Sequence, residues 1–172
     1  MNIEIFDRQS IKNTPLFKNI IELDIDNMRE VFEHSETGHP VEKRKKSFDY
    51  PGVLITAFVS DGLAGYLEYG PCWDNPDNIY ISSIQIKPEY RNTKLFAELL
   101  RTAKKDLVRK NFKNIISAVQ KTNFNAIKIF RKLGFLIEEK ENNPKSYRLI
   151  GTKDKILHWD VKSNNELNKL IF

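Results

Sequence analysis

The chain of 172 residues is 40% hydrophobic and 30% charged, with a net charge of +5 and a sequence pI near 9.2. These values are typical of one soluble globular domain that is long enough to bury a core. No apolar run reaches membrane-spanning length, and the single cysteine, Cys72, excludes an internal disulfide. The basic balance favours an anionic ligand, with a nucleic acid and a polyphosphate cofactor both open.

The two ends of the chain bear on its location and organisation. The N-terminus lacks the basic-then-apolar order of a signal peptide, and a lone cysteine fits a reducing compartment, so we expect a cytoplasmic protein. One domain is expected over residues 1–172, with a core over about 15–151 and a C-terminal extension over 152–172. The extension ends in apolar residues that fit packing on its own domain or a homodimer contact, namely Leu167, Leu170, Ile171 and Phe172.

The first part of the chain predicts a strand, a helix and a hairpin. Residues 3–6 favour a short strand, and residues 16–33 favour a helix because apolar residues recur there at helical spacing. Residues 34–49 are polar and basic, and we expect an irregular or partly helical connection. Its basic cluster Lys43–Lys46 is interpreted as a solvated face. Residues 53–69 predict a hairpin that turns near Gly62.

The middle of the chain predicts a loop, a strand and a helix. Residues 70–78 contain two prolines, two asparagines and two aspartates, which is typical of a loop. Residues 79–86 form a long, largely apolar strand. Residues 92–110 predict an amphipathic helix with Thr93 or Asn92 as its N-cap.

The rest of the chain continues this alternation. Asn123 is the expected cap of one further helix, and Gly134 is its expected end. The remaining expected elements are a strand over 114–119, a helix over 123–133, a hairpin over 135–139 and 146–150, a strand over 156–161 and a helix over 164–172. This order of helices and strands predicts a mixed α/β fold.

The turn between the strand over 79–86 and the helix over 92–110 predicts an anion site. A helix N-terminus presents unpaired backbone N–H groups, with the positive end of the helix dipole behind them. Phosphates are the anions most often bound in this way. Arg91 and Lys94 add positive charge at the same place. A phosphorylated ligand is therefore expected near mid-chain.

Two segments, one around this turn and one further along the chain, carry a combined motif. In the first segment, the matching residues are Ile86, Pro88, Tyr90, Arg91, Leu99 and Leu100. In the second, they are Asn123, Ala126, Lys132, Gly134 and Phe135. In this order and spacing the segments resemble the signature of the GNAT superfamily, the Gcn5-related N-acetyltransferases, over roughly residues 50–150.

The resemblance implies an α/β fold in which helices flank a mixed, mostly antiparallel central sheet. That sheet splays between its fourth strand, here 79–86, and its fifth strand, here 114–119. The gap would admit the pantetheine arm of acetyl-CoA, or of another acyl-CoA, which is the implied co-substrate. The resemblance implies no metal.

The same resemblance implies which residues hold the cofactor. A backbone N–H within Ile84–Ile86 would hold the thioester carbonyl, and the N–H groups of residues 92–97 would hold the diphosphate. Asn123 would contact the cofactor arm, and Phe130 stands where the family usually has a tyrosine that protonates the leaving thiolate. The full set is Ile84, Gln85, Ile86, Arg91, Asn92, Thr93, Lys94, Leu95, Phe96, Ala97, Asn123 and Phe130.

Three residues depart from the family's pattern close to the implied chemistry. Lys94 and Phe96 replace two loop glycines that let the backbone approach the diphosphate closely. Lys94 offers a charge for phosphate instead, and Phe96 is expected to point inward. Phe130 cannot donate a proton, so either another group does so or the thiolate leaves unassisted.

The general base is the part of the implied site that the sequence determines least. The family often places a carboxylate on or near the fourth strand, whereas this chain has Ser82 and Ser83 there. Glu68 on the preceding hairpin is the expected carboxylate, acting directly or through water, and it forms the candidate catalytic set with the two serines. Asp74 and Asp77 in the following loop are alternatives.

The residues and the resemblance together predict an acyl-CoA-dependent N-acetyltransferase. The acetyl group is expected to pass to an amine of a small molecule or a protein by direct attack in a ternary complex. One alternative is a non-catalytic GNAT-like domain that binds CoA or a protein partner, which the changes at Lys94, Phe96 and Phe130 favour. The other is a basic nucleic-acid-binding module, but only the charge supports it and no binding motif is found. Neither nucleic acid nor a membrane is therefore an expected partner.

Overall fold

A computed structural model describes the chain apart from residues 30–39, 61, 92, 140–144 and 158–172. Its strands are β1 (Asn2–Asp7), β2 (Val53–Val59), β3 (Gly62–Pro71), β4 (Asn78–Ile86), β5 (Asn114–Gln120), β6 (Leu136–Glu139) and β7 (Ser146–Thr152). Its helices are α1 (Pro15–Asn27), α3 (Pro40–Ser47), α4 (Leu95–Leu107), α5 (Phe124–Lys132) and α6 (Lys153–Leu157), with short 3-10 turns at Gln9–Ile11 and Pro88–Tyr90. Within these described ranges, no helix is long and apolar enough to span a membrane.

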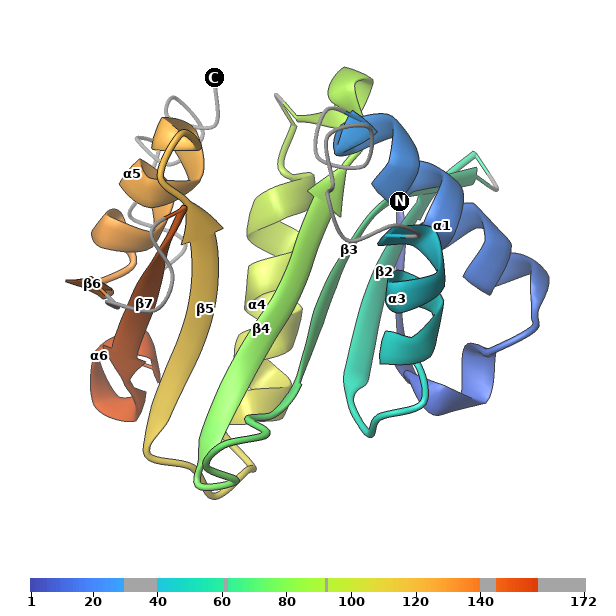
Figure 1. The fold of residues 1–172 in the computed structure, drawn as a ribbon. Helices are drawn as coiled ribbons and strands as arrows, with labels where there is room; N and C mark the ends of the chain where they lie inside the picture. Colours follow the sequence, from blue (N-terminus) through green and yellow to red (C-terminus); the bar gives the residue numbers. More distant parts are fainter. Residues whose placement is uncertain (30–39, 61, 92, 140–144, 158–172) are drawn as a thin grey trace.

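The strands form one sheet in the order β1-β2-β3-β4-β5-β7-β6. All neighbours run antiparallel except β4 and β5, which are parallel. These two strands pair only between Asn78–Ile81 and Asn114–Ser117, and beyond that point they diverge, as Figure 1 shows. The predicted fold, a mixed and mostly antiparallel sheet that splays between the fourth and fifth strands and is flanked by helices, is therefore confirmed.

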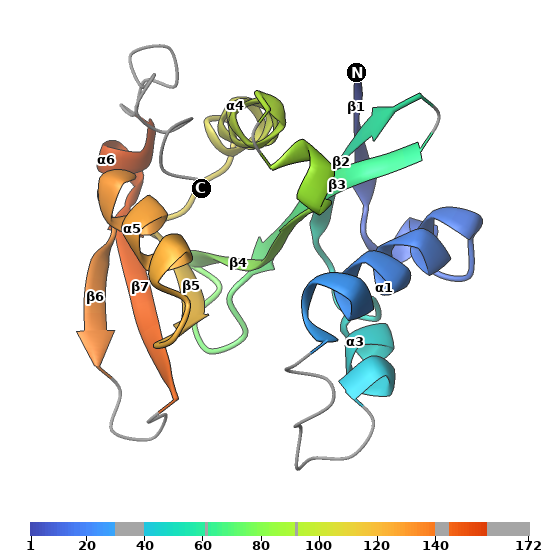
Figure 2. The ribbon, with the colours of Figure 1, turned by 90° about the horizontal axis from the view of Figure 1, so that it is seen from above.

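Helices cover both faces of this sheet. α1 and α3 lie over one face of the half that contains β1 to β4, and α4 lies over the other face (Figure 2). The apolar core under α1 and α3 includes Ile20, Phe48 and Leu54. The larger core under α4 and α5 includes Leu99 and Ile115. The sheet thus separates two cores, and its strands carry side chains to both.

Local sequence signals account for several helix ends. Thr14 accepts a backbone N–H of the first turn at 3.3 Å and Pro15 follows it, which starts α1. Asn123 accepts the N–H of Ala126 at 3.0 Å and starts α5. Gly134 ends that helix with a φ of +86°, a conformation that residues with a Cβ rarely adopt. The predicted cap and end of this helix are confirmed.

The start of the helix predicted over 92–110 differs from the expectation. α4 begins at Leu95, with Lys94 at the cap position and no side-chain cap. Thr93 accepts the N–H of Leu95 at 3.2 Å from the preceding turn, and Asn92 lies outside the described residues. A 3-10 turn at Pro88–Tyr90 lies between β4 and α4, and the helix starts after it, later than the apolar periodicity indicates.

Two other predicted boundaries need correction. α1 ends at Asn27, before the predicted end at residue 33, and the Asn27 side chain bonds to β4 instead. Residues 30–33 of the predicted helix lie outside the described residues. The connection over 34–49 is partly helical, which is one of its two expected forms, because α3 occupies Pro40–Ser47; residues 34–39 lie outside the described part of the chain. β3 continues into the predicted loop as far as Pro71, because a proline is tolerated at the end of a strand.

The strand predicted over 156–161 is wrong where the structure describes it. Residues Lys153–Leu157 form helix α6. Ile156 is buried and packs over Gly151 from this helix, so one apolar contact rather than strand pairing explains the local pattern. The predicted helix over 164–172 lies outside the described residues.

A β-bulge in β4 lies at the point where β4 and β5 part. The consecutive residues Glu68 and Tyr69 of β3 pair with Ser83 and Ile81, which leaves Ser82 as the extra residue. Pairing with β5 also ends at Ile81. A bulge bends its strand and re-aims the side chains near it. Here both serines bond to side chains on the face that α1 and α3 cover.

Candidate functional site

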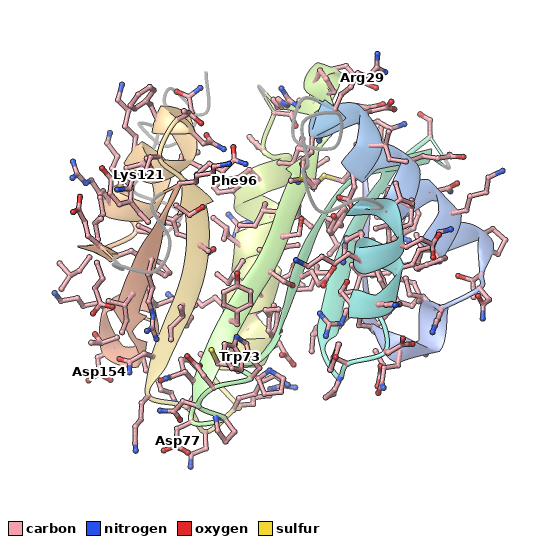
Figure 3. All side chains as sticks on the ribbon, in the orientation of Figure 1. Arg29, Trp73, Asp77, Phe96, Lys121 and Asp154 are labelled. Atoms are coloured by element: carbon pink, nitrogen blue, oxygen red, sulfur yellow. The ribbon has the colours of Figure 1, made fainter. Side chains whose placement is uncertain are left out.

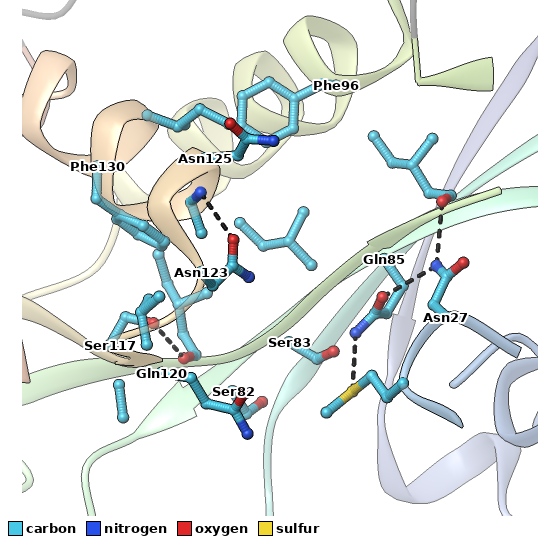
Figure 4. Close-up of a pocket in the computed structure, with 18 of the residues that line it drawn as sticks. Asn27, Ser82, Ser83, Gln85, Phe96, Ser117, Gln120, Asn123, Asn125 and Phe130 are labelled. Atoms are coloured by element: carbon cyan, nitrogen blue, oxygen red, sulfur yellow. Dashed lines mark hydrogen bonds between the residues drawn. The ribbon is translucent and has the colours of Figure 1, made fainter. Parts of the chain in front are cut away.

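A cavity of about 930 Å³ opens where β4 and β5 separate. Its walls come from the ends of β4 and β5 that no longer pair with each other, the C-terminal end of α1, and helices α4 and α5 (Figure 4). The lining residues include Asn27, Ser82, Ser83, Ile84, Gln85, Ile86, Arg91, Phe96, Ala118, Gln120, Asn123, Asn125 and Phe130. A cavity of this size is in the range that holds small-molecule and cofactor ligands.

The backbone of β4 presents hydrogen-bonding groups to this cavity. Lys87 donates its N–H to the carbonyl of Ala64 on β3 at 2.9 Å. Backbone groups of successive residues in an antiparallel strand alternate in direction, so Ile84 and Ile86 turn theirs away from β3 and toward the splay. β5 no longer pairs with β4 there. In the described sheet, the N–H groups of Ile84 and Ile86 therefore face the cavity without a strand partner.

Asn27, the last residue of α1, closes one end of the cavity. Its Nδ2 donates to Gln85 Oε1 and to the Ile86 carbonyl oxygen, both at 3.0 Å. Its Oδ1 accepts from Arg91 Nη2 at 2.8 Å, and Arg91 Nε donates to the Ile86 carbonyl at 3.2 Å. Asn27 thus joins α1 to the free edge of β4, and the same junction holds the Arg91 guanidinium.

A buried cluster of charges lies beside the cavity, under α1 and α3. Glu68 on β3 is fully buried and pairs with Arg8 Nη1 and with Arg44 Nη2, each at 2.6 Å. Arg8 lies over Gly52, where a Cβ would come within 2.9 Å of the guanidinium. Burial opposes the ionisation of Glu68, but the two arginines outweigh it and hold the pKa of Glu68 below its ordinary value. Glu68 is therefore a stable anion at neutral pH.

Asp24 on α1 is the second buried carboxylate of this cluster. It accepts from Arg44 Nε at 2.6 Å and from the hydroxyl of Tyr66. Burial here outweighs the attraction of Arg44, so the pKa of Asp24 is raised above its ordinary value. Burial, and next the charge of Asp24, raise the pKa of Tyr66 well above its usual range. The two carboxylates share one arginine, yet their pKa values shift in opposite directions.

Arg44 corrects the interpretation of Lys43–Lys46 as a solvated face. Its side chain is only 15% exposed, and its guanidinium carbon lies 4.5 Å from the centroid of the Phe48 ring. It turns inward because two buried carboxylates would be strongly unfavourable without a cation between them. Lys43 and Lys46 stay exposed, so the basic cluster contributes one cation to the interior.

Two serines connect the charge cluster to the cavity. Ser82 Oγ donates to Glu68 Oε1 at 2.8 Å, and Ser83 Oγ lies 3.0 Å from the Tyr66 hydroxyl. Both serines line the cavity (Figure 4). A ligand there meets two hydroxyls with a buried carboxylate behind each: Glu68 behind Ser82, and Asp24, through Tyr66, behind Ser83.

Comparison with known proteins identifies the family to which this fold and site correspond. The sequence profile of the acetyltransferase (GNAT) family matches residues 17–135, well over half of the chain. The chain belongs to this GNAT acetyltransferase family. None of the curated proteins searched matches the chain at a significant level.

Solved structures of GNAT proteins share the fold. PaiA N-acetyltransferase from Thermoplasma acidophilum, solved in complex with coenzyme A, has a TM-score of 0.64 and 16% identity, over 88% of this chain and 99% of that one. Aminoglycoside 6'-acetyltransferase type Ii has a TM-score of 0.66 and 15% identity, over 88% and 97%. A GNAT acetyltransferase from Staphylococcus aureus Mu50 has a TM-score of 0.66 and 14% identity, over 88% and 99%. At these identities the likeness concerns the fold alone.

The cofactor residues predicted for this GNAT protein divide into two groups. Those that line the cavity are Ile84, Gln85, Ile86, Arg91, Phe96, Asn123 and Phe130. Thr93, Lys94, Leu95 and Ala97 are not among the lining residues, and Asn92 lies outside the described part of the chain. Leu95 is buried in the core, while Thr93 and Lys94 are exposed at the start of α4. A role for these positions in holding the cofactor stays a prediction.

The two phenylalanines that depart from the GNAT pattern belong both to the core and to the cavity wall. Phe96 is 6% exposed and points inward, as the sequence predicts. Phe130 is also 6% exposed, and its ring packs edge-on against Phe135 with centroids 4.9 Å apart. The bulk of Phe96 therefore replaces a glycine without closing the cavity.

The carboxylates of the loop after β3, considered as alternative bases, lie elsewhere. Asp74 accepts a hydrogen bond from Cys72, and Asp77 forms an ion pair with Lys113. Neither aspartate is among the residues that line the large cavity. Trp73 is 91% exposed, and Figure 3 shows it near Asp77, at the opposite end of β4 from Phe96. Tyr80 lines a separate, smaller cavity. The opening at the splay is therefore not plugged by these aromatic side chains.

The sequence-based prediction does not include several residues of the site, among them Asp24, Asn27 and Tyr66. Asp24 lies at helical spacing from Ile20 and Ile21, and an acidic residue within an apolar helix face indicates a buried partner. Asn27 lies beyond that periodic stretch, and its contacts with β4 are not local. Tyr66 gives no signal either, because a tyrosine in an apolar strand is ordinary for a core.

Proposed function

We propose that this protein is an acyl-CoA-dependent N-acetyltransferase. It transfers an acetyl group from the CoA thioester to an amine of a small molecule or a protein, by direct attack in a ternary complex. The observation that carries the proposal is the cavity at the splay, where free backbone N–H groups of β4 lie beside Ser82 and Ser83. Membership of the GNAT family supports acetyl transfer, and the fold neighbour in complex with coenzyme A supports the cofactor.

The free edge of β4 suits the extended arm of an acyl-CoA. Ile84 and Ile86 offer N–H groups at strand spacing, and amides in the pantetheine arm are natural partners for them. At the start of α4, the helix N-terminus and Lys94 suit the diphosphate, because both stabilise phosphate charge. Asn123 supplies a side-chain amide from the α5 wall. The residues present therefore fit an acyl-CoA on both sides of the splay.

Acetyl transfer requires a free amine, a stabilised oxyanion and a departing thiolate. An alkylamine has a pKa of about 10.4, so it must lose a proton before it attacks at neutral pH. The N–H of Ile84 or Ile86 donates to the carbonyl oxygen as that oxygen becomes anionic. The C–N bond forms, the C–S bond breaks, and the sulfur takes the electron pair. A thiol has a pKa of about 8.5, so the thiolate leaves more readily than the amine, even with Phe130 in place of a proton donor.

The candidate catalytic set divides into groups that meet the amine and a group behind them. Ser82 and Ser83 line the cavity, and an amine N–H there can donate to their oxygen atoms. Glu68 orients Ser82 at 2.8 Å and balances Arg8 and Arg44. Because its pKa is lowered, Glu68 is a weak proton acceptor, and we assign it a positioning role.

A non-catalytic CoA-binding domain is the second candidate function. Lys94 and Phe96 replace the small loop residues of the GNAT pattern, and Phe130 removes the usual proton donor. The loss of a proton donor lowers turnover without affecting affinity for the cofactor. This set of replacements is the specific feature that favours binding without transfer.

Turnover of acetyl-CoA with a panel of amines separates the two functions. Thiol release by the full chain should depend on the amine, and mass spectrometry should find the amine heavier by one acetyl group. Release without amine gives the hydrolysis control. If calorimetry detects CoA binding but no amine increases thiol release, the binding domain is the better account. If neither CoA nor acetyl-CoA binds, both functions are rejected.

A further inference from the structure

We propose that Asp24 is the final acceptor of the amine proton, which reaches it through Ser83 and Tyr66. This inference rests on the proposed function and specifies the proton path of the same site. The path runs from the cavity wall on β4, through β3, to the buried face of α1.

Three side chains form a continuous hydrogen-bonded path from the cavity to Asp24. Ser83 lines the cavity. Its Oγ lies 3.0 Å from the hydroxyl of Tyr66, which in turn donates to Asp24 Oδ1. Tyr66 is fully buried and Asp24 is 2% exposed, so bulk water does not compete along the inner part of the path. Only the Ser83 end is open to a ligand.

The direction of each hydrogen bond follows from the donors available. An ionised carboxylate can only accept, so the single hydroxyl proton of Tyr66 points to Asp24. The Tyr66 oxygen must then accept from Ser83, which makes Ser83 the donor of that bond. The Ser83 oxygen keeps a lone pair for a donor in the cavity, such as an amine N–H. The path is therefore polarised toward Asp24.

The charges around Asp24 make it a better proton acceptor than Glu68. Among the described residues, the titratable groups facing Asp24 are Arg44 from α3 and Tyr66 and Glu68 from β3. Arg44 stabilises the Asp24 anion, whereas burial and the negative charge of Glu68 favour its protonated form. Glu68 itself is held ionised by Arg44 and Arg8. A proton that enters the cluster therefore settles on Asp24.

The proposed step conserves protons and charge. The ammonium form of the acceptor gives one proton to Ser83 Oγ, while Ser83 passes its hydroxyl proton to Tyr66 and Tyr66 passes its own to Asp24 Oδ1. The amine lone pair then forms the C–N bond, and the C–S electron pair leaves on sulfur. The thiolate takes the second amine proton and becomes the thiol. Asp24 returns its proton along the path after the product leaves, so each ammonium acetylated releases one proton to solvent.

Two substitutions at Ser83 test the entry to the path. S83A removes the hydroxyl that receives the proton and leaves Tyr66 and Asp24 in place, whereas S83T keeps a hydroxyl on the same strand. With an acceptor amine of pKa about 10, we expect S83A to lower kcat by about a hundredfold, the lower end of the range for positioned acid–base groups. S83T should retain most of the wild-type rate. CoA affinity in calorimetry should be the same in both variants.

Substitution of Asp24 tests the end of the path through a pH profile. In the wild type, kcat/KM should fall on the acid side as Asp24 takes up a proton in the free enzyme. D24N should lose this acid limb and should lower the rate at neutral pH by about tenfold or more. E22Q is the matched control, because Glu22 is a 58% exposed carboxylate on the same helix. E22Q should keep both the limb and the rate, and if D24N fails to fold, the Ser83 pair decides.

Each outcome of these assays supports or overturns the path. Loss of rate in S83A with recovery in S83T, together with a missing acid limb in D24N, would support it. An active wild type whose S83A and D24N variants keep the rate and the limb would overturn the path alone. A wild type that binds CoA but acetylates no amine would overturn the proposed function, and the path with it.

Discussion

Asp24 and Glu68 differ in their surroundings more than in their chemistry. Both carboxylates are buried and both bond to Arg44. Glu68 has a second guanidinium, from Arg8, and its pKa is lowered, whereas Asp24 has only the shared one and its pKa is raised. When the surroundings shift the pKa values of two neighbouring acids in opposite directions, one acid often serves as a proton acceptor or donor and the other stays charged. At this scale, the number of cations around each carboxylate distinguishes the one whose pKa is lowered from the one whose pKa is raised.

Removal of Arg44 should be one of the most destabilising single changes in the molecule. R44M leaves two buried carboxylates short of a cation, and loss of one partner from a buried ion pair costs about 3–5 kcal/mol. K43M on the same helix is the control, because Lys43 is exposed. Denaturant unfolding measures both. A loss for R44M no larger than that of K43M would contradict the buried cluster.

The pH dependence of stability should report on Glu68. Its pKa in the folded protein lies below the ordinary 4.5, so its stabilising contribution is present above that pH and is lost as the pH falls through the lowered value. E68Q has no such proton to bind. Its melting temperature should therefore fall less than that of the wild type between about pH 5 and pH 3. Parallel curves would mean that Glu68 is not held ionised.

Phe130 offers a test of whether the missing proton donor limits the reaction. F130Y adds a hydroxyl to a ring that is 6% exposed and packed against Phe135. An unpaired buried hydroxyl costs about 1–3 kcal/mol, so we expect a lower melting temperature with no gain in turnover. Rate and melting point are measured together. A gain of about tenfold or more at unchanged stability would instead place the hydroxyl beside the leaving sulfur, as a positioned acid.

At the scale of elements, local sequence patterns predict those strand and helix boundaries that depend on neighbouring residues. Strand β2 lies where alternation and the following turn place it, and Asn123 and Gly134 bound α5 as cap and C-terminal residue. The bulge at Ser82 and the inward turn of Arg44 were beyond such patterns. Both depend on partners many residues away in the chain, and neither partner shows in a local window. The motifs predict several residues that line the cavity, whereas the charge cluster beside it can be recognised only in the tertiary structure.

The start of α4 carries the predicted phosphate site, and a charge reversal tests it. K94E should weaken CoA binding by about tenfold or more, because a repelling charge replaces an attracting one near the helix N-terminus. The difference from the wild type should shrink at high salt, since Lys94 is exposed and its charge is screened. K105E, an exposed change in the second half of the same helix, is the control. Equal CoA affinities in calorimetry, with both variants folded, would place the diphosphate elsewhere.

At the scale of the whole molecule, the splay brings two features of β4 together: its edge toward β5 and its polar face toward the charge cluster. Within the described sheet, β4 no longer pairs with β5 beyond Ile81, and its polar face lies against the charge cluster under α1 and α3. The bulge at Ser82 supports both arrangements, because it lies where the pairing with β5 stops and where two serines turn to one face. In the proposed function, the edge that would hold the cofactor and the face that would meet the acceptor lie along a few residues of one strand.

A crystal structure of the protein with acetyl-CoA tests the central claim most directly. The pantetheine arm should lie between β4 and β5, with the thioester carbonyl oxygen within hydrogen-bond distance of the N–H of Ile84 or Ile86. The acetyl group should face Ser83. Acetyl-CoA bound outside the splay, or a thioester out of reach of both N–H groups, would contradict this account.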